Sequence, residues 1–139
     1  MTIVGFNFTK LGAEKKDMAK GEINVSNNVA IDNVDEKKIS LANDKQKVLA
    51  FTFSFTSKYE PDIGSINFRG DILWMEETKK AKEILDGWKK DRKLPKEIMT
   101  GILNTILNKC NIQALILSEQ INLPPPIPLP KLQPAQKQE

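Results

Sequence analysis

Histidine is absent from the 139 residues, and cysteine occurs once, as Cys110. Histidine is the commonest general base of enzymes and the commonest protein ligand of metals, so its absence removes the usual Ser-His and Cys-His nucleophile arrangements. A single cysteine cannot form an internal disulfide, and without histidine it cannot complete a zinc site. The chain also lacks the glycine motifs that bind nucleotide phosphates. We therefore expect no enzyme, no metal site and no cofactor.

Long apolar runs are also missing. No uncharged apolar stretch approaches the roughly 18 residues that a membrane-spanning helix needs. The first residues run directly into Ile3, Val4 and Phe6, without the basic segment that opens a secretory signal. Together with the single cysteine, these features predict a cytoplasmic protein that does not insert into membranes.

Arginine is scarce, although the chain is mildly basic. The 21 Lys and Arg residues are interleaved with 18 Asp and Glu residues, for a net charge of +3, and Arg69 and Arg92 are the only arginines. Nucleic-acid binders usually gather basic residues in one stripe and read base edges with arginine. We therefore expect no nucleic-acid partner.

Apolar residues alternate with polar ones in four segments, which predicts four β-strands. They cover residues 1–10, 22–32, 47–58 and a segment from the turn at 60–64 to about Met75. Residues 11–21 read as a loop or a bulged crossing, and residues 33–46 as a connection that could include a short strand or turn. Asn27 interrupts the apolar face of the second strand, which favours a β-bulge or a sheet edge there.

Aromatic residues make up only 6% of the chain, but they cluster in the last two predicted strands. Phe51, Phe53 and Phe55 share one face of the third strand, and Phe68 and Trp74 share one face of the fourth. This aromatic ladder has two interpretations. It is either ordinary core between sheet and helices, or part of it lines an apolar groove open to other polypeptides.

Helical spacing replaces the alternation after Glu76, and predicts helices over 77–92 and from Pro95 to about Gln120. The apolar stripe of the second helix is broad enough to need cover on two sides, which its own sheet and a second subunit could provide. Cys110 lies on this stripe, so we interpret it as a small buried hydrophobe rather than a reactive thiol.

Proline dominates the segment after the second helix. Residues 124–130 read Pro-Pro-Pro-Ile-Pro-Leu-Pro, which predicts an extended chain near polyproline II. Pro125 and Pro128 form the frame of a ligand for an SH3- or WW-type domain. The large aliphatic residues between the prolines favour instead a strap laid against its own domain. We expect one domain over 1–132, including this strap, and a disordered tail over 133–139.

The order of these elements, and the run Gln120-Ile121-Asn122-Leu123-Pro124-Pro125 after a long helix, resembles the SecB family of export chaperones. The segment Val48 to Thr56 is similar to the family's second strand. The resemblance implies an α+β fold, with a four-stranded antiparallel sheet and two helices on one face. It also implies a dimer or tetramer with apolar grooves. By position, the groove residues would be Phe53, Phe55, Phe68, Trp74, Ile127 and Leu129.

The function that the resemblance implies is ATP-independent capture of unfolded or non-native polypeptides. The export chaperone SecB is acidic, which suits docking to SecA, whereas this chain is basic, so the SecA interaction is not carried over. A second hypothesis remains open. The chain would then be a dedicated interaction module with one fixed partner, either a homo-oligomeric adaptor or a toxin-neutralising protein.

Overall fold

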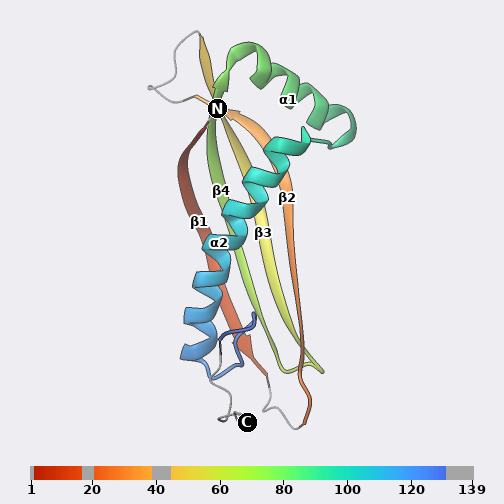
Figure 1. Cartoon of the computed structure of the whole chain (residues 1–139), viewed down its shortest axis with the longest axis vertical. Coiled ribbons are helices and arrows are strands. Elements are labelled where there is room, and N and C mark those ends of the chain that lie inside the picture. Colours follow the sequence, from red (N-terminus) through yellow and green to blue (C-terminus); the bar gives the residue numbers. More distant parts are fainter. Residues whose placement is uncertain (1, 17–20, 39–44, 131–139) are drawn as a thin grey trace, which may run out of the picture.

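A computed structural model describes residues 2–16, 21–38 and 45–130. Its elements in chain order are β1 (Thr2–Lys15), β2 (Asn24–Lys37), β3 (Gln46–Glu60), β4 (Gly64–Glu77), α1 (Thr78–Asp91) and α2 (Lys96–Gln120). The four strands form one antiparallel sheet in the order β1-β4-β3-β2 (Figure 1). The predicted α+β class and four-stranded sheet are therefore confirmed. The tail over 133–139 lies outside the described residues.

The hairpin of β3 and β4 carries the aromatic ladder on a single face, as predicted. Its register places Phe55 opposite Phe68, and their rings stack with centroids 5.6 Å apart. Phe53 lies opposite Gly70, and a methyl group added to this glycine would come within 2.7 Å of the Phe53 ring. Gly70 thus provides the gap into which the phenyl ring packs.

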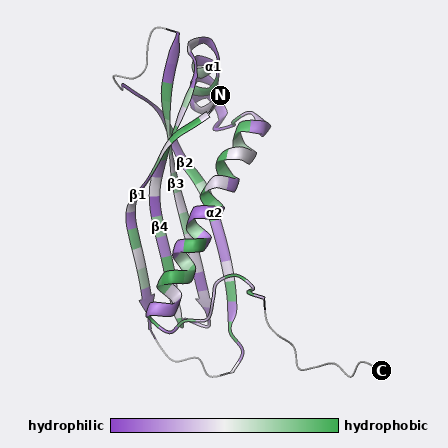
Figure 2. Cartoon of the chain, turned by 60° about the vertical axis from the view of Figure 1, so that its left-hand side comes forward, coloured by the Kyte–Doolittle hydropathy of each residue, from purple (hydrophilic) through white to green (hydrophobic). Residues whose placement is uncertain are grey.

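Helix α2 lies diagonally across the ladder face of the sheet (Figures 1 and 2). Its buried residues recur at every fourth position: Ile98, Ile102, Ile106, Cys110, Ala114 and Ser118. The buried residues of α1 join the same hydrophobic cluster as the ladder, as expected for helices on one face. Within the described ranges, neither helix combines the length and the apolar character needed to cross a membrane.

Strands β1 and β2 extend further than the alternation predicted. Residues 11–15 belong to β1, where the sequence predicts a loop or a bulged crossing. Residues 33–37 belong to β2, where it predicts a connection that could include a short strand or turn. The cause is irregular register, with shifts between Ile3 and Gly5, between Phe8 and Lys10, and in β2 between Ile31 and Asn33. Each bulge moves the following side chains to the other face and breaks the period of two. The expectation of an edge or bulge around Asn27 is confirmed, because β2 is an edge strand.

Candidate functional site: the strap-end groove

A left-handed residue ends helix α2 and turns the chain back toward the sheet. Asn122 has φ of 58°, and the Leu123 amide donates to the Ser118 carbonyl over 2.8 Å. This is a Schellman cap, in which asparagine tolerates the left-handed conformation. Pro124 follows and excludes any further helical turn.

The proline-rich strap, residues 124–130, is tied to β3 and β2 by two hydrogen bonds. The Tyr59 hydroxyl donates to the Pro124 carbonyl over 2.5 Å, and burial raises the pKa of this hydroxyl to about 12. The Asn27 side-chain amide donates to the Pro126 carbonyl over 2.9 Å, and its oxygen accepts from Ser57. The Asn27 side chain thus links the strap to Ser57 of β3. The start of the strap lies against its own domain.

A pocket of about 680 Å³ opens between the strap, the end of α2 and the β3–β4 turn. We call it the strap-end groove. Its apolar lining is formed by Ile63, Leu115, Leu123, Pro124, Pro125 and Leu129, and its polar lining by Lys15, Ser118, Glu119 and Asn122. A groove of this size and composition suits a few apolar side chains of an extended polypeptide.

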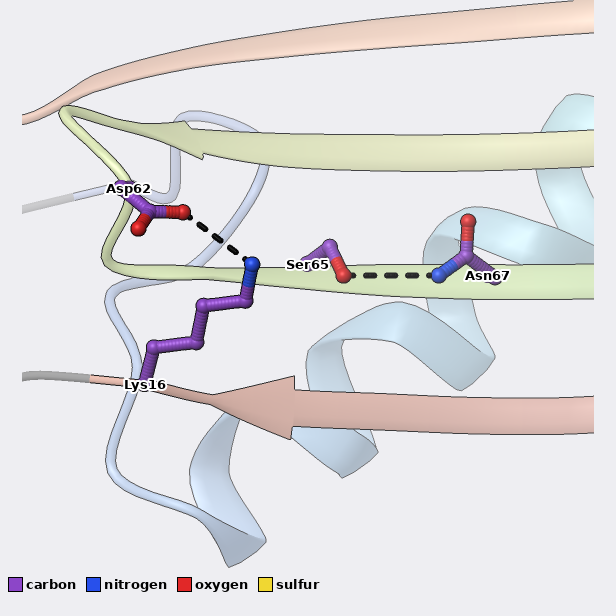
Figure 3. Close-up of polar contacts among 4 residues, drawn as sticks. All are labelled: Lys16, Asp62, Ser65 and Asn67. Carbon is purple, nitrogen blue, oxygen red and sulfur yellow. Dashed lines mark hydrogen bonds and ion pairs between the residues drawn. The ribbon is translucent and has the colours of Figure 1, made fainter.

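Two contacts fix the β3–β4 turn beside the groove. The Lys16 amide donates to the Ile63 carbonyl over 2.7 Å, and the Lys16 ammonium lies 3.1 Å from a carboxylate oxygen of Asp62 (Figure 3). The hydrogen bond with Asp62 raises the pKa of Lys16. Both side chains are exposed, so this ion pair adds little stability. The backbone bond is the contact that holds Ile63 in place.

No family model matches the sequence, and the search of curated proteins finds no match. Among solved structures, the chain is similar to the SecB-like chaperone Rv1957 of Mycobacterium tuberculosis, in complex with a ChAD peptide from the HigA1 antitoxin. The TM-score is 0.55 at 13% sequence identity, over 97% of this chain and 92% of that one. This chain has the SecB-like fold.

The six residues predicted to line a groove lie in three parts of the SecB-like fold, namely the core, the sheet at Trp74, and the strap. Phe53, Phe55 and Phe68 are at most 1% exposed and belong to the core. They are closed to an incoming polypeptide unless α2 leaves the sheet. Trp74 is half-buried, pairs with Leu49 in the sheet and donates its indole N–H to Glu76.

The two predicted strap residues differ in exposure. Ile127 is half-buried, whereas Leu129 is 44% exposed and lines the strap-end groove. Three apolar residues outside the strap, namely Ile63, Leu115 and Leu123, also line the strap-end groove, although the sequence does not predict them there. No local pattern singles these residues out, because they meet at the groove only through tertiary contacts.

Proposed function

We propose that this chain is an ATP-independent holdase that binds unfolded or non-native polypeptides, with the strap-end groove as a capture site. The observation that carries the proposal is an apolar groove of about 680 Å³ that presents the exposed side chain of Leu129. Apolar segments of an unfolded client would leave water by entering it, which is favourable and needs no nucleotide. The SecB-like fold supports the proposal, since the similar mycobacterial chaperone is described with a bound peptide.

The test is light scattering of a chemically unfolded enzyme, diluted into buffer with and without this chain and without nucleotide. We expect the chain to suppress aggregation near one oligomer per client. Leu129→Asp places a carboxylate at the groove and should weaken the suppression about tenfold, as loss of an apolar anchor does.

Val4→Asp is the matched control. Val4 is 45% exposed, against 44% for Leu129, and lies in β1 away from the groove lining. This variant should protect the client as well as the unchanged chain does. If both variants are folded, as judged by circular dichroism, and protect the client equally poorly, the groove is not the capture site. No suppression at several-fold excess would reject the holdase.

The second candidate is a dedicated module with one fixed partner, and the tight fixation of the strap favours it. A groove wall tied through Tyr59 and Asn27 is pre-organised for one shape of ligand. Unrelated unfolded enzymes distinguish the two functions. A holdase protects all of them, whereas a dedicated module protects none.

We also propose that a second copy covers the outer face of α2. Ile112 and Ile116 on this face are 61% and 46% exposed. Between Glu97 and Glu119 the helix carries a single charged residue, Lys109. A helix face with almost no charge and large exposed aliphatic residues is typical of the self-complementary contacts of homodimers.

A further inference from the structure

The basic charge of the chain is concentrated around one helix. Residues 78–97, which cover α1 and the start of α2, contain eight Lys and Arg against four Asp and Glu. The other 119 residues contain thirteen Lys and Arg against fourteen Asp and Glu. All lysines in 78–97 are exposed, and within the described ranges none of them forms an ion pair. The net charge of +3 therefore originates from this one segment of the chain.

The stability of α1 does not account for these lysines. Lys89 and Lys90 lie in the last turn, where cations complement the helix dipole. Lys79, Lys80 and Lys82 lie at the opposite end, where the dipole disfavours them, and the first turn has no acidic residue. The helix dipole therefore does not explain these three cations.

A cleft of about 280 Å³ lies between α1 and the adjoining ends of β2 and β3. Lys82 and Lys89 reach it from α1, together with Asp86 and the apolar side chain of Leu85. The Lys47 ammonium and the Glu36 carboxylate also line the cleft, but they lie 3.2 Å apart and neutralise each other. The cleft therefore has an excess of one unpaired positive charge beside an apolar surface.

We propose that this surface of α1 binds acidic segments of the polypeptides that the chain captures. The inference rests on the proposed function and names the chemistry of the client. Separated carboxylates could pair with Lys82 and Lys89 while an apolar side chain contacts Leu85.

A nucleic acid fits the same surface less well. A continuous phosphate backbone would meet Glu83 and Asp86 among the lysines. Arg92 is the one arginine on this surface, and it is already engaged, because its guanidinium lies 5.5 Å from the Trp88 ring centroid and donates to the Asp32 carbonyl. Trp88 is 7% exposed, so it offers no platform for stacking bases.

The position of the cleft also sets a spacing for the client. Ile63 lines the strap-end groove and Thr78 lines the α1 cleft, and β4 joins them with 14 residues. At the rise of a β-strand the two sites are about 45 Å apart along the sheet. A client that occupies both needs on the order of 14 extended residues between its apolar and acidic segments.

The test measures fluorescence anisotropy of a labelled peptide that contains four glutamates separated by Ser and Leu, and of its twin with glutamine at those positions. We expect the acidic peptide to bind about tenfold more tightly than its twin, and less tightly as NaCl is raised. The variant Lys82→Glu/Lys89→Glu should abolish the difference. Lys10→Glu/Lys58→Glu changes two exposed lysines outside the cleft by the same charge and should preserve it.

The inference would be overturned if the two peptides bound equally, or if both double variants lost affinity for the acidic peptide to the same extent. The inference would also be overturned, in favour of nucleic acid, if a single-stranded oligothymidylate bound more tightly than the acidic peptide and the Lys82→Glu/Lys89→Glu variant no longer bound it. Light scattering separates this surface from the holdase. If the chain does not suppress aggregation but binding of the acidic peptide still requires Lys82 and Lys89, the proposed holdase function is wrong and the acidic-peptide site is supported.

Discussion

At the residue scale, Gly70 is a position that the packing of the ladder constrains strongly. A Cβ atom there would collide with the backbone carbonyl of Asn7 and with the Phe53 ring. We expect Gly70→Ala to lower the free energy of unfolding by about 1–3 kcal/mol, the usual cost of overpacking. Urea denaturation measures it. Gly101→Ala is the control, because nothing lies within 4 Å of a Cβ added in α2. Equal stability of the two variants would contradict the packing described for β1, β3 and β4.

Cys110 allows a second test at this scale. It lies on the buried face of α2, and burial raises the pKa of its thiol to about 12. The reactive thiolate is therefore almost absent at neutral pH. We expect a thiol reagent to leave the native protein unmodified and to label one cysteine per chain in guanidinium chloride. Rapid labelling of the native protein would show that α2 opens from the sheet.

At the scale of elements, the strap depends on Tyr59, the one tyrosine of the chain. Its pKa is about 12 in the folded protein, against 10.0 for the unperturbed hydroxyl. A raised pKa contributes stability that is complete below pH 10 and is lost as the pH rises toward 12. We expect the tyrosinate absorbance to appear near pH 12 in the native protein and near 10 in the denatured one.

Replacing this tyrosine tests the same contact at neutral pH. Tyr59→Phe removes the donor to the Pro124 carbonyl and should cost about 1 kcal/mol in urea denaturation. The stability of Tyr59→Phe should also depend less on alkaline pH than that of the unchanged chain. A tyrosine that titrates near 10 in the native protein would mean that the strap leaves Tyr59 exposed.

The elements divide into those that the sequence predicts well and those that it does not. The β3–β4 hairpin and both helices were predicted within a few residues, because their apolar periods are regular and turn residues bound them. Strands β1 and β2 were predicted too short, because bulges interrupt the alternation. Of the residues predicted to bind polypeptides, only Leu129 lines the strap-end groove, since Ile63 and Leu115 meet there through tertiary contacts that no local pattern encodes.

At the scale of the whole molecule, the self-association proposed for the outer face of α2 can be tested in solution. We expect the chain to elute as an oligomer in size-exclusion chromatography with light scattering. Ile112→Lys should shift it to a smaller species, because a buried lysine at a contact would lose its hydration. Val4→Lys, at a similarly exposed residue of β1, should leave the mass unchanged. A monomer in the unchanged chain would reject self-association through α2.

The sheet order places the N-terminal strand against the last strand of the sheet to be synthesised. Residues paired between β1 and β4 are 49 positions apart at Lys15 and Gly64, and 73 apart at Thr2 and Met75. The β3–β4 pair closes a short turn, whereas β1 must close a long loop, which costs more chain entropy. During synthesis β1 is made before β4, so Phe6 and Phe8 lack the strand that they pair with until β4 is complete. A protein proposed to bind non-native polypeptides thus has, before β4 is made, exposed apolar residues of the kind that it is proposed to bind.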